Sequence, residues 1–130
     1  MEFRENEPIY LQIAAHVCDQ ILLGKWAAEN KIPSVRDLAV TFQVNPNTVM
    51  RTYEQLQNQE VIYNKRGIGF FVTPDAVKKV KAQRKERFLQ QDLPAFFHNI
   101  FLLEIDLDEI QKRYEAYKSE NYEQEIEQKP

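Results

Sequence analysis

The chain has 130 residues, of which 43% are hydrophobic and 28% are charged, and its formal net charge is −3. This length allows one modest domain with an appendage and excludes two full domains. No apolar run approaches the roughly 18 residues that a membrane helix needs, and the acidic start Met1-Glu2-Phe3-Arg4-Glu5 is not a signal peptide. We therefore expect a cytoplasmic protein that has no membrane partner.

The sequence lacks the residues that several classes of function require. Cys18 is the only cysteine, and His16 and His98 are the only histidines, which excludes a disulfide framework and a zinc ligand set. No nucleophile stands beside a base, so we expect no enzyme, no metal and no cofactor. The net charge argues against a uniformly basic nucleic-acid binder. However, 9 of the 20 acidic residues lie in residues 104–130, so a local positive surface elsewhere is compatible with the total.

The first predicted helix opens at Pro8 and ends at Gly24. Its apolar residues recur every four positions, at Ile9, Ile13, Val17 and Ile21. Trp26 follows the glycine, and we expect its ring to cover the small core on which this helix packs.

A second helix is predicted from Ser34, because Ser34 and Asp37 have the spacing of a capping box. Only Gln43 and Val44 separate this helix from a third, which begins with Asn45 as N-cap and Pro46 at the first helical position. Two short helices joined by so tight a turn form a helix-turn-helix, whose second helix is offered to a DNA groove.

The third helix has a polar face that carries Asn47, Thr48, Arg51 and Gln55. Arginine can form a fork of two hydrogen bonds to guanine, asparagine can do the same to adenine, and threonine can reach phosphate or a thymine methyl. The alternative is an amphipathic core helix with a solvated face, which one helix taken alone would favour. The segment that follows changes this weighting.

Two β-rich runs, residues 61–63 and 70–73, flank a turn that contains Gly67 and Gly69. Lys65 and Arg66 place positive charge near the tip of this predicted hairpin, while glycine permits positive φ and close approach to another surface. Three helices followed by such a hairpin make a winged helix-turn-helix. The expected fold is mainly α with a small β-hairpin, followed by a two-helix C-terminal segment.

The sequence also resembles the GntR family of bacterial transcriptional regulators, and in particular its short YtrA-type branch. The resemblance covers residues 8–73 and rests on Ile32-Pro33-Ser34-Val35-Arg36-Asp37-Leu38-Ala39, Val44-Asn45-Pro46-Asn47-Thr48-Val49 and Arg66-Gly67-Ile68-Gly69 with Phe71-Val72. It implies that Arg36, Arg51, Asn47 and Thr48 contact the major groove, and that Arg66 and Gly67 enter the minor groove. The whole candidate DNA-binding set is Ser34, Arg36, Asn45, Asn47, Thr48, Arg51, Lys65, Arg66, Gly67 and Gly69.

Two residues depart from the family pattern. Glu29 stands where the family often has glycine before the second helix, and Glu60 replaces the usual glycine after the third. Both positions lie in turns, so these departures put the local backbone geometry in doubt and leave the reading face unchanged.

Beyond the wing, Thr73 and Pro74 are placed to start a fourth helix, which Pro94 should kink or interrupt. Apolar residues then recur at spacings of three and four, as in a coiled coil. The candidate dimerisation residues are Leu93, Phe96, Phe97, Ile100, Leu103, Leu107, Ile110 and Tyr114. Asp106 and Glu109 have capping-box spacing, so we predict a break near Ile105 and two helices, roughly 75–103 and 107–118.

Two such helices cannot bury their aromatic residues alone, and a second copy of the chain is the simplest partner. The alternative is that they fold back on the winged domain of their own chain. Ser119 to Pro130 is polar and without periodicity, which predicts a disordered tail. The predicted domains are therefore 1–73 for DNA binding, 74–118 for dimerisation and 119–130 for the tail.

The leading hypothesis is a homodimeric regulator, in the resembled branch usually a repressor, that binds an inverted repeat in double-stranded DNA. The site of any small-molecule effector would have to form between helices or across the dimer. A second hypothesis is a protein-interaction module that keeps the winged fold without binding DNA. The joint presence of the basic and polar residues on the third helix and wing argues against it.

Overall fold

The computed structural model describes residues 2–128. The chain divides into two compact units, residues 1–85 and residues 86–130. Within the described residues, no helix is both long enough and apolar enough to cross a membrane.

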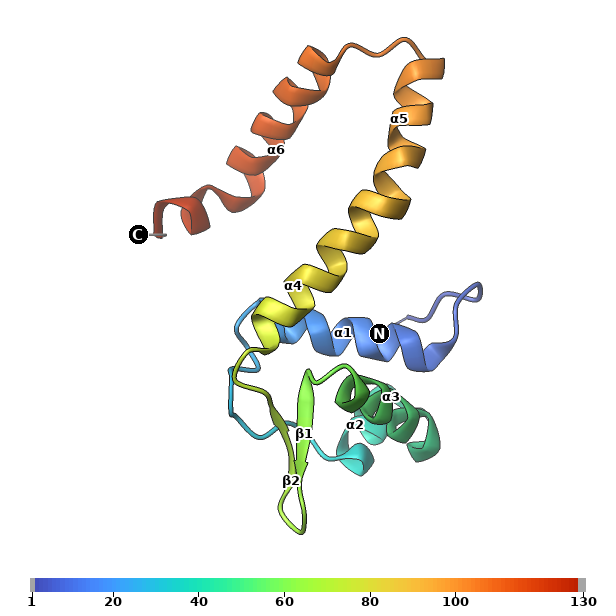
Figure 1. Cartoon of the computed structure of the whole chain (residues 1–130), viewed down its shortest axis with the longest axis vertical. Helices are drawn as coiled ribbons and strands as arrows, with labels where there is room; N and C mark the ends of the chain where they lie inside the picture. Colours follow the sequence, from blue (N-terminus) through green and yellow to red (C-terminus); the bar gives the residue numbers. More distant parts are fainter. Residues whose placement is uncertain (1, 129–130) are drawn as a thin grey trace. The chain divides into compact units, whose positions relative to one another are not determined.

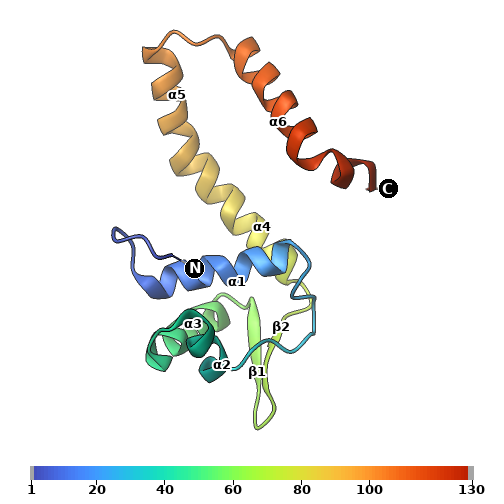
Figure 2. The same ribbon diagram turned by 180° about the vertical axis from the view of Figure 1, so that it is seen from behind.

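Unit 1 is a winged helix-turn-helix, as the sequence predicted. It contains helices α1 (Ile9–Leu22), α2 (Val35–Phe42) and α3 (Pro46–Asn58), the strands β1 (Ile62–Lys65) and β2 (Gly69–Val72), and most of α4 (Ala76–Arg87). The helices pack together while the tip of the hairpin points away from them (Figures 1 and 2). The largest fully buried side chains of the core are Tyr53, Ile13, Ile21, Leu56 and Ile62.

The two predicted helix starts around the tight turn are confirmed. The Ser34 side-chain oxygen accepts a hydrogen bond of 3.0 Å from the Asp37 N–H, and the Asn45 side-chain oxygen accepts one of 2.8 Å from the Asn47 N–H. Pro46 occupies the first turn of α3, where its missing N–H would have had no partner inside the helix. These caps fix the phase of both helices and hence the residues that each helix exposes.

Left-handed backbone follows helices α1, α2, α3 and α5. The residues with positive φ at these ends are Gly24, Gln43, Glu60 and Glu104. After α3, for example, the Val61 N–H donates to the Leu56 carbonyl and the Glu60 N–H donates to the Gln57 carbonyl, each at 2.9 Å. This pair of bonds is the Schellman motif, which satisfies the last carbonyl groups of a helix.

The two glutamates that depart from the family pattern both adopt the conformation that glycine prefers. Glu29 has φ 66° and Glu60 has φ 60°. The backbone geometry that glycine would give is therefore kept, at the steric cost that a Cβ atom carries there. The Glu60 carboxylate forms an ion pair with Lys79, at 3.1 Å from its Nζ, which offsets part of this cost.

The hairpin differs from the prediction at both ends of its turn. The strands pair antiparallel from Ile62–Val72 to Lys65–Gly69, so Lys65 and Gly69 lie in the strands and not in the turn. Residues 29–32 also run beside β2, which the sequence did not indicate. The Glu29 N–H donates to the Val72 carbonyl at 2.8 Å, and Lys31 forms a bridge with Phe71.

The predicted start of the fourth helix at Pro74 is two residues early, although the rough bound of 75 is within one residue of the observed start. Helix α4 begins at Ala76, and the Thr73 hydroxyl does not cap it. That hydroxyl instead lies 2.9 Å from the Glu60 carbonyl oxygen and 3.1 Å from the Val61 carbonyl oxygen, and its single proton is shared between them. Thr73 therefore closes the wing onto the turn that follows α3.

Unit 2 contains a turn of π-helix (Phe88–Asp92), helix α5 (Leu93–Leu102) and helix α6 (Leu107–Gln128). The predicted break near Ile105 and the start at Leu107 are confirmed. The capping box is only half formed, because the Asp106 carboxylate accepts from the Asp108 N–H while Glu109 pairs with Arg113 at 3.0 Å.

Helix α6 runs on to Gln128, where the sequence had predicted a disordered tail from Ser119. The last two residues of that tail lie outside the described residues. The physical reason for the correction is that residues 107–128 contain no glycine or proline and are rich in glutamate, glutamine and lysine, which favour helix.

We predict that Glu29→Gly raises the free energy of unfolding by about 0.5–1 kcal/mol. Removing Cβ relieves the strain of positive φ, although glycine loses more backbone entropy on folding. Chemical denaturation of the variant measures this change. The matched control is Glu54→Gly on the exposed face of α3, which should lower stability by about 1 kcal/mol. If both variants were destabilised equally, the strain at Glu29 would be negligible.

Candidate nucleic-acid interface

Helix α3 buries one face and exposes the other. Val49, Thr52, Tyr53 and Leu56 are buried, whereas Asn47 and Arg51 are exposed. The predicted polar face thus points outward at Asn47 and Arg51, whereas its other two members, Thr48 and Gln55, are half-buried. Met50, which is 41% exposed, and Glu54 lie on the same outward face, and the sequence analysis did not select them. A helical step of 100° per residue places both beside Asn47, so the signal was available.

Two buried polar side chains hold α3 in place. The Tyr53 hydroxyl donates to the Pro33 carbonyl at 2.6 Å, and the Thr52 hydroxyl donates to the Tyr10 carbonyl at 2.7 Å. Burial, assisted by the nearby Asp37 charge, raises the pKa of Tyr53, so the hydroxyl remains a donor. The first bond joins α3 to the entry of α2, and the second joins it to the start of α1.

Arg51 does not extend freely into solvent. Its guanidinium carbon lies 4.0 Å from the centre of the Tyr10 ring, in a cation–π contact. The contact borders a hollow of about 420 Å³, which is lined by Pro8, Ile9, Tyr10, Asn47, Thr48 and Arg51. A guanidinium that stacks by its face keeps its N–H groups at the edges, where they can still donate. Tyr10 was not among the predicted site residues.

The remaining candidates on or beside the helices differ in their exposure and in the hydrogen-bonding groups that they keep for another partner. Ser34 and Asn45 both use a side-chain oxygen to cap a helix, so Ser34 keeps its hydroxyl proton and Asn45 keeps its amide N–H groups for another partner. Arg36 is exposed in the first turn of α2, and Thr48 is half-buried at the start of α3.

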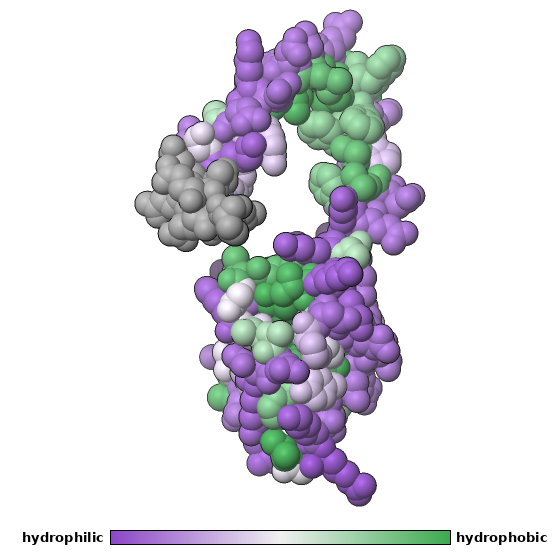
Figure 3. Space-filling view, turned by 60° about the vertical axis from the view of Figure 1, so that its left-hand side comes forward, coloured by the Kyte–Doolittle hydropathy of each residue, from purple (hydrophilic) through white to green (hydrophobic). Residues whose placement is uncertain are grey.

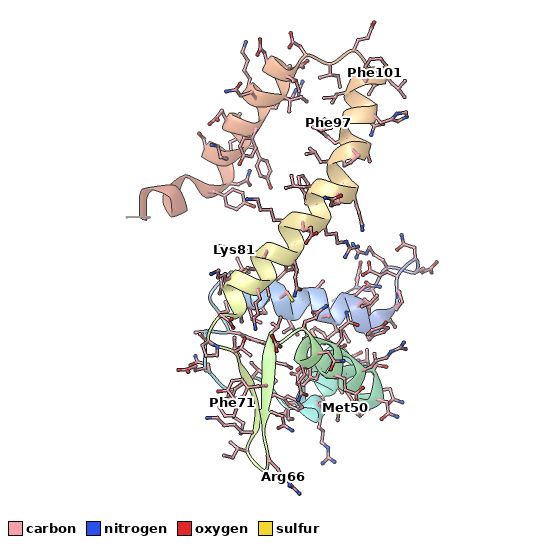
Figure 4. All side chains as sticks on the ribbon, in the orientation of Figure 1. Met50, Arg66, Phe71, Lys81, Phe97 and Phe101 are labelled. Atoms are coloured by element: carbon pink, nitrogen blue, oxygen red, sulfur yellow. The ribbon has the colours of Figure 1, made fainter. Side chains whose placement is uncertain are left out.

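The wing tip is a β-turn whose first residue, Lys65, is also the last residue of β1. The Ile68 N–H donates to the Lys65 carbonyl at 2.9 Å, and Gly67 has φ 80°, the combination found in a type II turn. A Cβ atom on Gly67 would meet nothing within 4 Å, so the tip is bare. Arg66 projects from the tip, at the same lower end of the view as Met50 in Figure 4.

Gly69 has a partner inside the protein. A Cβ atom at Gly69 would lie 2.9 Å from the Lys31 Cε, so the absence of a side chain makes room for this lysine. Lys65, opposite Gly69 in the hairpin, has its Nζ 4.5 Å from the centre of the Phe71 ring. Among the described residues, no group of three or more His, Cys, Asp or Glu side chains could hold a metal ion.

Comparison with known proteins gives one consistent result. The family described as "Bacterial regulatory proteins, gntR family" matches residues 9–72. The chain is 29% identical to the HTH-type transcriptional repressor YtrA of Bacillus subtilis, with 82% of each chain covered.

Two solved structures extend the comparison. A GntR-family transcriptional regulator from Bacteroides thetaiotaomicron is 52% identical, has a TM-score of 0.72, and covers 86% of this chain and 97% of its own. The DNA-binding domain of AraR in complex with operator ORR3 is 30% identical over 56% of this chain and 86% of its own, with a TM-score of 0.51.

The matched segment begins with α1 and ends with β2, so it coincides with the helices and hairpin that carry the candidate interface. The fold agrees with these relatives, which are transcriptional regulators and not enzymes. The chain belongs to the GntR family of bacterial transcriptional regulators, whose helix-turn-helix domain binds DNA.

Proposed function

We propose that this protein is a homodimeric, sequence-specific repressor that binds an inverted-repeat operator. The observation that carries the proposal is the exposed polar face of α3, held by buried hydrogen bonds beside a bare, basic wing tip. The repressor role follows the similarity to YtrA, and operator binding follows the similarity to the AraR complex.

In the proposed complex, α3 lies in the major groove. Asn47 and Arg51 face the base edges, because both are exposed and their side chains suit bidentate bonds to adenine and guanine. Met50 supplies an apolar contact of the kind that thymine methyl groups accept. Arg36, in the first turn of α2, faces the phosphate backbone beside this groove.

The wing enters the neighbouring minor groove in this proposal. Arg66 carries the positive charge at the tip, and the bare Gly67 lets the backbone approach closely. Narrow minor grooves concentrate negative potential and attract arginine, so this contact would respond to groove width more than to base identity.

The argument for a dimer comes from unit 2. None of its described side chains is buried, although many are large and apolar. Phe97 is 49% exposed, Leu103 69% and Phe101 81%. Hydrophobic surface gathers over α5 in Figure 3. Monomeric soluble proteins rarely expose such a surface, and a second copy of unit 2 offers the same apolar side chains in return.

A twofold dimer would present two copies of α3, one to each half-site. The centres of the half-sites should then lie roughly 10 base pairs apart, or a small multiple of that spacing. Selection of bound duplexes from a random pool tests this proposal directly. Recovery of an inverted repeat supports it, while failure to enrich any sequence contradicts it.

We predict that Arg51→Ala weakens binding to the selected operator by about 1–3 kcal/mol and relaxes the preference at one base position. Titration of the operator and of its single-base variants measures both effects. An equal loss on operator and random DNA would instead assign Arg51 to a phosphate.

The Tyr10 ring should matter through Arg51, because the guanidinium lies over it in a cation–π contact. Tyr10→Leu should weaken operator binding, whereas Tyr10→Phe, which keeps an aromatic ring, should restore most of it. In a double-mutant cycle, Tyr10→Leu should have little further effect once Arg51 is alanine. Additive losses would show that Tyr10 acts independently of Arg51.

The dimer is tested with Phe97→Asp combined with Ile100→Asp. Each carboxylate would cost several kcal/mol in an apolar interface, so the chains should separate. The variant should sediment as a monomer with an intact winged unit, lose most operator affinity, and keep weak, salt-sensitive binding to one half-site.

The matched control for the dimer is Ala95→Asp combined with His98→Asp. These two residues lie on the opposite side of α5 from Phe97 and Ile100, because a helix turns 100° per residue. The control adds the same charge to the same helix and should leave the dimer intact. Wild-type protein that sediments as a monomer at micromolar concentration would contradict the proposed dimer.

A further inference from the structure

The two faces of the wing have different surroundings. On the inner face, Ile62 and Val72 are buried, and the Phe70 ring lies 4.9 Å from the Tyr53 ring of α3. Side chains alternate along a strand, so Tyr63, Lys65, Gly69 and Phe71 belong to the outer face. Figure 4 shows Phe71 on the side of the hairpin away from α3.

Lys31 adds a second lysine to the outer face. It is paired with Phe71 by a β-bridge, which places its side chain on the same face as Phe71. The bare backbone of Gly69 then receives it, because the Lys31 Cε and Nζ lie 2.9 Å and 3.7 Å from the place that a Cβ atom would take. Gly69 lies next to the tip, so the Lys31 side chain extends along the wing toward it.

Two aromatic rings lie on the same face as the two lysines, and Lys65 lies over them. The Tyr63 and Phe71 rings stack with centres 5.7 Å apart, and the Lys65 Nζ lies 4.5 Å from the centre of Phe71. Since Lys65 is the register partner of Gly69, the position that receives the Lys31 side chain is the one opposite Lys65. We define the outer wing face as Lys31, Tyr63, Lys65 and Phe71.

Two lysines therefore share one face of the wing, and like charges on neighbouring positions of a sheet repel. Some cations in unit 1 form ion pairs: Lys79 lies 3.1 Å from a Glu60 oxygen, and Arg84 lies 2.6 Å from an Asp19 oxygen. Among the described residues, neither Lys31 nor Lys65 forms an ion pair with a carboxylate. The fold therefore leaves uncompensated positive charge on this face.

We propose that the outer wing face binds phosphate groups of the DNA strand that borders the minor groove on the side away from α3. This inference rests on the proposed function, in which the wing enters that groove. A minor groove is only about 6 Å wide and is bounded by two phosphate ridges. The inner face of an inserted wing leads back toward α3, so the outer face meets the opposite ridge.

Gly69 acquires a role in this arrangement without touching DNA itself. A side chain there would collide with Lys31 and would displace its ammonium group from the wing. The contacts made by the outer wing face would fix the register of the protein on the duplex and would carry no base preference, as phosphate contacts do.

The test is the salt dependence of DNA binding by the full-length protein. Lys31→Gln should weaken binding to operator and random DNA by the same factor. It should also reduce the slope of log affinity against log salt by about 0.9, the release expected for one phosphate contact on duplex DNA. Lys31→Gln combined with Lys65→Gln should reduce the slope about twice as much. Thermal melting should match the wild type, because Lys31 is exposed.

Lys25→Gln is the matched control, since Lys25 is an exposed lysine in the turn after α1 and its loss changes the net charge equally. A slope for Lys31→Gln that equals the slope for Lys25→Gln would overturn the inference, as would a loss confined to the operator. These results differ from failure of the proposed function, in which the wild-type protein itself would bind no DNA. Phosphate ethylation interference supplies a second readout: one ridge beside the wing should lose its interference in Lys31→Gln only.

Discussion

The position of α3 depends on two hydrogen bonds made from its buried side. Tyr53 and Thr52 place hydroxyl groups inside a mainly apolar core, and each donates to a backbone carbonyl of an earlier segment. A buried hydroxyl without a partner would cost about 1–3 kcal/mol, so alternative placements of α3 that break these bonds are disfavoured. The apolar contacts hold the helix against the core, and the hydroxyl groups fix where along the core it rests.

The same bonds connect the core to the exposed face. The Thr52 hydroxyl donates to the carbonyl of Tyr10, and the ring of Tyr10 makes a cation–π contact with Arg51, which is the neighbour of Thr52 in α3. The start of α1 is therefore held by a hydrogen bond from buried Thr52, and its Tyr10 side chain contacts Arg51, the residue proposed to read DNA. Ordering a long side chain before binding reduces the entropy that binding must overcome. This is a physical reason for an aromatic residue at the second position of α1.

The local signals in the sequence predicted the helices and the tight turn well, because each start has its own chemistry: Ser34 caps one helix, and Asn45 with Pro46 begins the next. Contacts between distant residues could not be predicted. Nothing in the local sequence places Tyr10 on Arg51 or Lys31 beside Gly69, since both contacts depend on how separate segments pack. The tail was misjudged for a different reason, because its charged residues resemble those of disordered chains but also favour helix.

Gly69 is proposed to serve DNA binding through a neighbouring side chain and not through a contact of its own. The sequence offers a glycine in a basic hairpin, and direct contact between glycine and DNA is the natural interpretation. In the structure, the Lys31 side chain occupies the space that a side chain at Gly69 would take. It brings a positive charge from the segment before α2 to the side of the wing. The strand-like segment 29–32 is therefore as much a part of the wing as β1 and β2. Its unusual positive φ at Glu29 is the bend that starts this segment beside β2, so a strained backbone position and an exposed cation two residues later are parts of one feature.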